Sequence, residues 1–429
     1  MRNWIIILFF ISWCCSCSPI SKKSLDKTFR LTDENFKDHT GFALYDLEKQ
    51  KSLYEYKSSH YFTPGSNTKI FTFFSCLTLL GDSVPALKYI QRDDSLIFWG
   101  TGDPSFLYKE VYDNTRVFSF LKSTSYSLYF SDRNFQTTNF GPGWAWDDYN
   151  DYYSAERSPF PIYGNILSLK AVQKKIGTQP PYFRNYLKIE NKEEKAKVIR
   201  RFESNEFVFH PNFSEKEFNA DVPFKVAPEL TANLLTDTLK KMVRLVPKPL
   251  SKSARTLYSV PVDSLYKVMM QESDNFIAEQ LLLMCSETLS DTLQPEIAIR
   301  HIKKNFLQDL KDEPRWVDGS GLSRYNLFTP RSVVQLWEKI YQRVPRERLF
   351  ALLATGGKSG TIKNWYYGKE PYIFGKTGSL SNNHCLSGYL VTKKGKTLIF
   401  AFMNNNFTAT VNDIRRNMEN ILRSIYESY

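Results

Sequence analysis

The clearest strand signals of this 429-residue chain lie near its two ends. Two strand-like segments, Gly41 to Leu47 and Ser52 to Tyr56, have polar residues 48–51 between them, which predicts one hairpin. Leu386 to Thr392 and Thr397 to Met403 flank the turn sequence Lys393-Lys394-Gly395-Lys396, which predicts another. A final amphipathic helix places its apolar residues three and four apart, at Val411, Ile414, Met418, Ile421, Leu422 and Ile425. We therefore expect both ends to share one sheet in an α/β fold.

The middle of the chain differs in character from both ends. It contains short aromatic strands such as Ser127 to Phe130, the turn Gly141-Pro142-Gly143, and an acidic, Tyr-rich run from Asp147 to Tyr153. Helical periodicity resumes near Val262 and again from Phe276. These shifts predict a large β-rich insertion between the two parts of the sheet domain.

The expected domains follow from this division. Residues 24–85 and 256–429 form one discontinuous domain, and residues 86–255 form one or more inserted accessory domains. The composition supports large folded cores, because 42% of the residues are apolar and 15% are aromatic.

The first 17 residues indicate export. About ten apolar residues from Trp4 to Trp13 follow Arg2, which suits a signal peptide better than a membrane-spanning helix. Ser16 before Cys17 resembles a bacterial lipoprotein cleavage site, so we expect lipidation of Cys17 and an exported protein that contacts the membrane only through this lipid. Cleavage without lipidation is the alternative.

Charge and cysteine content exclude several classes of protein. The net charge is +12, but Lys and Arg are dispersed, which argues against nucleic acid and favours an anionic cell-wall polymer or membrane surface. Cys76, Cys285 and Cys385 have apolar neighbours and no metal-binding spacing, so we expect buried free thiols, with no disulfide and no zinc site. No metal or cofactor is expected.

Three short motifs carry the chemistry: Ser66-Asn67-Thr68-Lys69, Ser273-Asp274-Asn275 and Lys376-Thr377-Gly378. Residues three apart share one face of a helix, so Lys69 can reach the Ser66 hydroxyl, and a helix N-terminus favours the developing alkoxide. Burial of Lys69 near a second cation, Lys376, lowers its pKa and allows a neutral amine to take the serine proton.

The other motif residues have complementary roles in acyl transfer. Ser273 supplies a hydroxyl that relays the proton, and Asn275 supplies an amide that holds Lys69 or the substrate. Lys376 and Thr377 bind a substrate carboxylate, while Gly378 allows close approach of the substrate. The backbone N–H groups of Ser66 and Ser379 would form the oxyanion hole.

Spacing separates these motifs from chance matches. Ser24-Leu25-Asp26-Lys27 also fits Ser-x-x-Lys, and Ser381-Asn382-Asn383 also fits Ser-x-Asn. Ser24 is expected in the linker after the leader, whereas Ser66 follows Pro64-Gly65 and opens a buried helix. The aspartates 147, 148 and 151 could form a carboxylate cluster, but a solvated loop is favoured. The five histidines are expected at the surface or in the core.

In this order and spacing, the motifs resemble those of the D-alanyl-D-alanine carboxypeptidase/endopeptidase family, the class C low-molecular-mass penicillin-binding proteins. The gap from Ser66 to Ser273 is about twice the gap from Ser273 to Lys376, as in this family. Further segments match at Gly100–Pro104, Trp144–Asp148, Tyr163–Asn165, Asp318–Ser323, Gly360–Ile362 and Phe374–Leu380. Two loops depart from the family pattern, at Gly100-Thr101-Gly102 and at Leu353 to Gly357.

The resemblance implies a penicilloyl-serine transferase fold, of the β-lactamase/transpeptidase-like type, with the β-rich insertion between the first and second motifs. It implies a periplasmic serine DD-peptidase that cleaves peptidoglycan stem peptides at D-Ala-D-Ala or at D-Ala-diaminopimelate cross-links. Ser66 would be the nucleophile, Lys69 the general base, and β-lactams would acylate Ser66. A β-lactamase and a non-catalytic envelope module on the same fold stay open as alternatives.

Overall fold

A computed structural model describes residues 20–111, 115–172, 175–190, 194–212 and 214–429. The predicted signal peptide at 1–17, with Cys17, lies outside these residues. Within the described ranges, no helix combines the length and the apolar character needed to cross a bilayer.

The two ends of the chain share one six-stranded antiparallel sheet, as predicted. Its strand order is β14-β15-β16-β17-β1-β2, and β1 pairs with β17 so that Phe42 lies opposite Phe402. The two predicted hairpins form β1 with β2 and β16 with β17. The bounds are β1 (His39–Asp46), β2 (Lys51–Tyr56), β14 (Ala354–Thr355), β15 (Ile373–Leu380), β16 (Asn383–Val391) and β17 (Thr397–Asn405).

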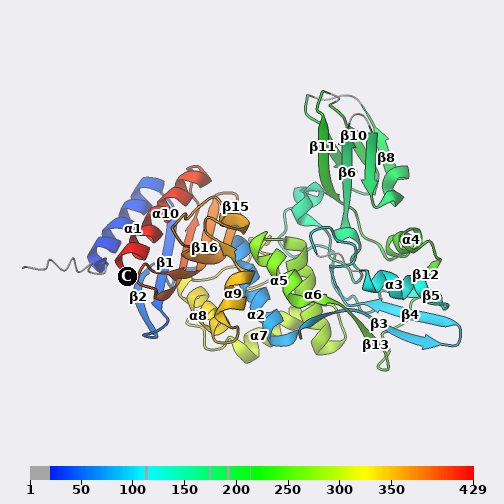
Figure 1. The fold of residues 1–429 in the computed structure, drawn as a ribbon, viewed down its shortest axis with the longest axis horizontal. Helices are drawn as coiled ribbons and strands as arrows, with labels where there is room; N and C mark the ends of the chain where they lie inside the picture. The colour runs from blue at the N-terminus through cyan, green and yellow to red at the C-terminus, as the bar shows by residue number, and fades with distance from the viewer. Residues whose placement is uncertain (1–19, 112–114, 173–174, 191–193, 213) are drawn as a thin grey trace, which may run out of the picture.

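Successive side chains of a strand point to opposite faces of the sheet, and here both sets are apolar. Helices therefore cover both faces of this sheet. Phe42 and Phe400 pack under α1 (Lys22–Phe36) and α10 (Val411–Ser428) on one face. Ala43 and Met403 belong to the core on the other face, which includes α2 and α8 (Figure 1).

The expectation that Ser24 lies in a linker is wrong, because Ser24 belongs to helix α1. Ser21 caps this helix by accepting a hydrogen bond from Ser24 N. Leu25 and Phe29, four residues apart, are buried against the sheet and hold the helix in place. Only these few apolar positions, among many charged ones, marked the helix in the sequence.

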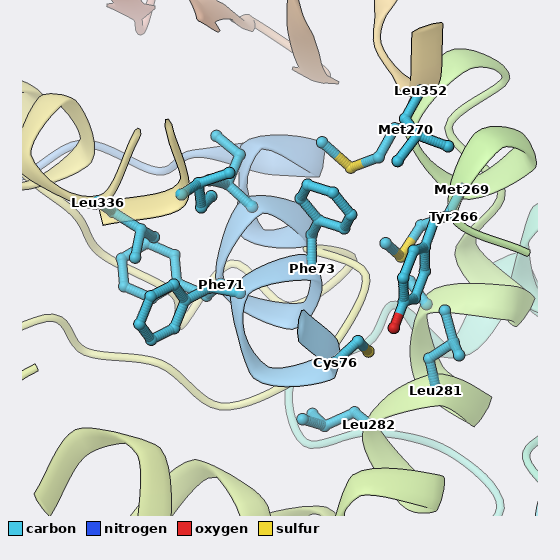
Figure 2. Close-up of a cluster of buried hydrophobic side chains, with 14 of the residues drawn as sticks. Phe71, Phe73, Cys76, Tyr266, Met269, Met270, Leu281, Leu282, Leu336 and Leu352 are labelled. Carbon is cyan, nitrogen blue, oxygen red and sulfur yellow. The ribbon is translucent and has the colours of Figure 1, made fainter. Parts of the chain in front are cut away.

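Helix α2 lies at the centre of a helical layer. Figure 2 shows Phe73 and Cys76 of α2 facing Tyr266, Met269, Leu281 and Leu282 of the neighbouring helices, while Phe71 lies on the other side of α2, near Leu336. Truncating a buried phenylalanine at such a position costs about 3–5 kcal/mol. The helices of this layer are α2 (Lys69–Leu79), α5 (Val262–Gln271), α6 (Asn275–Ser290), α7 (Pro295–Phe306), α8 (Pro330–Tyr341) and α9 (Arg346–Leu352).

The middle of the chain forms β-rich structure with its own hydrophobic core, drawn at the right of Figure 1. One five-stranded sheet has the order β12-β5-β4-β3-β13, and two three-stranded sheets have the orders β11-β6-β7 and β8-β10-β9. The bounds are β3 (Ser83–Arg92), β4 (Ser95–Gly100), α3 (Arg116–Ser123), β5 (Ser127–Ser131), β6 (Ile166–Val172), β7 (Lys175–Gln179), β8 (Leu187–Ile189), β9 (Lys197–Arg200), β10 (Phe207–His210), β11 (Glu217–Pro223), α4 (Pro228–Leu239), β12 (Val243–Leu245) and β13 (Arg255–Pro261).

The predicted limits of the insertion, 86 and 255, fall within strands β3 and β13, which pair with each other. The exact division into domains therefore stays a prediction. The predicted α/β fold with a β-rich insertion is confirmed. The three predicted free thiols, Cys76, Cys285 and Cys385, are buried and form no disulfide.

Candidate active site

The three motifs predicted from the sequence meet at one cavity of about 1150 Å³. It lies among segments from both ends of the chain and from the insertion. The predicted site residues in its wall are Ser66, Ser273, Asn275, Thr377 and Ser379. Lys69 and Lys376 are fully buried behind this wall and reach it through hydrogen bonds.

Ser66 lies on a short 3₁₀ turn, η1 (Gly65–Thr68), that runs directly into helix α2 at Lys69. The sequence pattern placed Ser66 on the helix itself, and the turn that continues into the helix keeps the same neighbours in contact. Lys69 Nζ lies 2.8 Å from Ser66 Oγ. It also lies 2.5 Å from Asn275 Oδ1 and 2.7 Å from the backbone oxygen of Ser320.

Burial governs the protonation of Lys69. Loss of hydration lowers the pKa of Lys69 to about 7, against the opposing effects of the carboxylates of Asp274, Asp318 and Glu279, named in order of size. A large fraction of Lys69 is therefore neutral near pH 7. Burial is the main cause of the lowered Lys69 pKa, so the effect expected from the positive charge of Lys376 is not the main one.

Lys376, on strand β15, holds the second motif. Its Nζ donates to Ser273 Oγ at 2.8 Å and to the backbone oxygen of Thr377 at 2.9 Å. Burial lowers the pKa of Lys376 well below its usual value, and the charge of Lys69 lowers it further. Ser273 has a positive φ of 67°, which is uncommon for a residue other than glycine and occurs often at functional sites.

Close packing brings the end of β15 against the turn that carries Ser66. A Cβ atom on Gly378 would lie 2.1 Å from the backbone oxygen of Pro64, so only glycine fits there. Gly65 has a φ of +51°, and a Cβ on it would lie 2.9 Å from Ser379 N. The backbone N–H of Ser379 is thus next to the turn that carries Ser66, and Asn67 Nδ2 donates to the oxygen of Lys376 at 3.0 Å.

Side chains that the sequence analysis did not single out hold Lys69 in place. Glu279 lies one turn after Asn275 on α6, and its Oε1 accepts hydrogen bonds from the backbone N–H groups of Gly319 (2.9 Å) and Ser320 (2.7 Å). The carbonyl of Ser320 is the one that accepts from Lys69. Arg157, from the insertion, lies 3.5 Å from Glu279 Oε2. The four-residue spacing from Asn275 was the available signal for Glu279.

The acidic, Tyr-rich run forms part of the cavity wall, through Asp147, Asp148, Tyr152 and Tyr153. Its backbone contacts the second motif directly, because Asn275 Nδ2 donates to the oxygen of Tyr153 at 3.0 Å. The interpretation as a solvated loop alone is therefore incomplete: Asp147 is exposed, but the run belongs to the site. Only contacts between distant segments reveal this.

One histidine lies beside the site. His384 is buried, and its Nδ1 lies 2.7 Å from Ser379 Oγ. Burial lowers the pKa of His384 to about 3, so the ring is neutral at ordinary pH. It holds the Ser379 side chain, and the hydrogen bonds of Lys69 go to Ser66, Asn275 and Ser320 instead.

Comparison with known proteins identifies similar chains along nearly the whole length. The model of the D-Ala-D-Ala carboxypeptidase 3 (S13) family matches residues 22–425. The D-alanyl-D-alanine carboxypeptidase DacB of Haemophilus influenzae is 21% identical over 86% of each chain. The penicillin-sensitive carboxypeptidase A of Dictyostelium discoideum is 22% identical over 82% of this chain and 80% of its own.

Solved structures show the same fold. Penicillin binding protein 4 of Haemophilus influenzae aligns with a TM-score of 0.73 and 20% identity, covering 91% of this chain and 97% of its own. The predatory peptidoglycan endopeptidase Bd3459 of Bdellovibrio bacteriovorus aligns with a TM-score of 0.51 and 14% identity, covering 90% and 93%. A further structure of Bd3459, acylated by penicillin G, has a TM-score of 0.50 and 14% identity and covers 90% and 92%.

Proposed function

The chain belongs to the D-Ala-D-Ala carboxypeptidase 3 (S13) family and is a serine DD-peptidase, and we propose that Ser66 is its nucleophile and Lys69 its general base. The substrates are stem peptides of peptidoglycan, cleaved at D-Ala-D-Ala or at a D-Ala-diaminopimelate cross-link.

The surroundings of the Lys69 amine carry this proposal. A neutral amine has two N–H donors and one lone pair, and Lys69 Nζ has two carbonyl oxygens within reach, Asn275 Oδ1 and the oxygen of Ser320. With both N–H groups donated to these oxygens, the lone pair faces Ser66 Oγ at 2.8 Å. The amine is thus positioned to accept the proton of the serine hydroxyl.

Acylation then follows from these positions. As Ser66 Oγ bonds to the carbonyl carbon of the substrate, its proton passes to Lys69 Nζ. The N–H groups of Ser66 and Ser379 stabilise the negative oxygen of the tetrahedral intermediate. The C–N bond breaks as the proton held by Lys69 passes to the leaving amine, and an ester to Ser66 remains. Water then attacks this ester and gives a proton to Lys69; the proton passes on to Ser66 Oγ as the ester bond breaks, which releases the peptide acid and the free serine.

The second lysine positions the leaving side of the substrate. Lys376 donates to the Ser273 hydroxyl at 2.8 Å, and we take this hydroxyl to be the relay for the proton on its way from Lys69 to the leaving amine. Thr377 lines the cavity, and its Oγ1 lies 2.7 Å from Thr361 Oγ1. Together with Lys376, Thr377 binds the terminal carboxylate of the substrate. Gly378 allows β15 to pack against the turn that carries Ser66. Strand β14 pairs with β15 only at Phe374 and Gly375, so the edge of β15 beyond Gly375 is free of β14 for the substrate backbone.

Penicillin is expected to acylate Ser66, because a β-lactam offers a reactive carbonyl to the same nucleophile. Two similar proteins support this: one is a penicillin-sensitive carboxypeptidase, and the other is an endopeptidase whose structure is acylated by penicillin G. Export to the periplasm and a lipid on Cys17 complete the proposal, since both would bring the enzyme to the cell wall.

Replacement of Ser66 by Ala tests the proposal. S66A should release no D-alanine from a stem pentapeptide and should take no covalent label from a fluorescent penicillin. S24A is the matched control, because Ser24 belongs to the other Ser-x-x-Lys sequence, in α1, and should keep full activity and labelling. Persistent labelling of S66A would refute the assignment, and rapid loss of the penicilloyl adduct from the wild type would favour a β-lactamase.

A further inference from the structure

The most exposed large apolar side chains of the described residues lie beside the cavity. Trp146 has 75% of its surface exposed and Tyr152 has 69%, the two highest values among such residues. Phe202, 50% exposed, lies in the turn after β9, and its ring is 6.2 Å from the ring of Trp146 in an edge-to-face arrangement. Exposed aromatic groups that cluster in this way mark a binding surface more often than chance.

This aromatic surface, formed by Trp146, Tyr152 and Phe202, continues directly into the cavity that contains Ser66. Ala145 and Asp147, on either side of Trp146, both line the cavity, and so does Tyr152. A substrate that enters the cavity therefore has its remaining parts close to these rings.

The charges beside the rings restrict the kind of ligand. Asp147 and Asp151 lie in the same short run and are exposed. Their negative charges disfavour an anionic polymer at this place, although the whole protein is basic. Carboxylates accept hydrogen bonds from hydroxyl and amide N–H groups, and ring faces take apolar C–H surface. A neutral sugar with N-acetyl and hydroxyl groups matches both properties.

We propose that Trp146, Tyr152 and Phe202 form a glycan-binding subsite that holds the N-acetylated sugar strand from which the stem peptide extends. This inference rests on the proposed function, because it takes the stem peptide as the ligand of the cavity. An extended peptide spans at most about 3.5 Å per residue, so a short stem bound at Ser66 keeps its sugar near the mouth of the cavity. The subsite makes polymeric peptidoglycan a better substrate than the free peptide.

The experiment compares two substrates: the free stem pentapeptide, and the same peptide attached to polymeric glycan. W146A and the double variant W146A/F202A should raise KM on the polymer by about tenfold, the loss of one well-packed aromatic contact. Their kcat and KM on the free peptide should equal those of the wild type. W146F, which keeps a ring, should recover most of the loss.

Tyr258→Ala is the matched control, because Tyr258 is 45% exposed on β13 and does not line the cavity. Y258A should behave as the wild type on both substrates. Equal KM values for W146A/F202A and wild type on the polymer would overturn the subsite, and so would an equal loss on both substrates. The test of the proposed function is independent: activity of S66A on the free peptide would refute that function, whatever the result for the subsite.

A binding assay separates the glycan from an anionic polymer. The S66A protein should bind insoluble peptidoglycan stripped of stem peptides, and W146A/F202A in that background should bind it less well. If these substitutions weaken only the binding of an anionic cell-wall polysaccharide, the assignment to a neutral glycan is wrong.

Discussion

The floor of the cavity, formed by Ser66, Lys69 and Lys376, contrasts with its rim, formed by residues 146–153. Lys69 and Lys376 are fully buried, and their contacts run to carbonyl and hydroxyl groups contributed by several distant segments. The rim carries the most exposed aromatic residues, and its aspartates are partly or fully in contact with water.

Because of this difference, the floor is suited to the chemical step and the rim is suited to binding of the substrate. Burial shifts the pKa values of the floor residues, so that an amine can act as a base near neutral pH. The rim offers ring surface and carboxylates in water, where single interactions are weak. We therefore expect substitutions on the floor to change the chemical step and its pH dependence, and substitutions at the rim to change binding by smaller factors.

The largest effect is expected from Lys69→Gln. Loss of the proposed general base should lower kcat/KM by about 10²–10⁴-fold, measured by release of D-alanine. K27Q, the matched change in the other Ser-x-x-Lys sequence, should be silent. In the wild type the neutral amine is the active form, so kcat/KM should rise with pH through the pKa of Lys69, about 7. An unchanged rate in K69Q would show that another residue acts as the general base.

Glu279→Gln should have an intermediate effect and shift the pH profile. Gln keeps an oxygen for the N–H groups of Gly319 and Ser320 but removes a negative charge that raises the pKa of Lys69. The acidic limb of kcat/KM should therefore move to lower pH, with a loss of about threefold to tenfold at the optimum, since the two hydrogen bonds lose their charge.

A neighbour on the same helix separates this effect from lost stability. Gln280 is equally buried, but it bonds Gly102 and Ser158 and does not contact Ser320. Gln280→Ala should lower Tm and leave the acidic limb where it is. If the acidic limb of the kcat/KM profile shifts in Q280A but not in E279Q, Glu279 does not have a positioning role.

The smallest effect is expected from Asp151→Asn at the rim. Asp151 is exposed and accepts a hydrogen bond from the Tyr153 hydroxyl at 3.0 Å, which an amide oxygen can also accept. Activity should stay within about threefold of the wild type, as for other surface changes, and the pH profile should not move. A shifted pH profile would show that the charge of Asp151 changes the pKa of Lys69, and the rim and the floor would then not be electrostatically independent.

The sequence predicted the sheet domain well because its signals are strong and local. The two hairpins follow from strand-like segments that flank short polar turns, and the final helix follows from its helical period. Their elements are β1, β2, β16, β17 and α10. Helix α1 was missed, because Leu25 and Phe29 are few among charged residues and gain their meaning only from the sheet beneath them. The limits of the insertion fall within paired strands, where local pattern gives no boundary.

At the site, local spacing identified Ser66 with Lys69 but not the residues that hold them. Glu279 and Arg157 act through contacts with segments more than a hundred residues away or through backbone groups, which no local pattern encodes. The rim was seen as acidic and aromatic, but its place in the cavity wall depends on how the insertion packs against α6.

The sequence by itself determined which chemical groups are present, in which order, and that Ser66 and Lys69 are neighbours, because three residues of helical backbone bring them together. Only the tertiary structure decided how deeply Lys69 and Lys376 are buried, which carbonyl oxygens accept hydrogen bonds from Lys69, and which aromatic rings border the cavity. These properties arise from contacts between segments far apart in the chain and from the exclusion of water, and both exist only once the chain is folded.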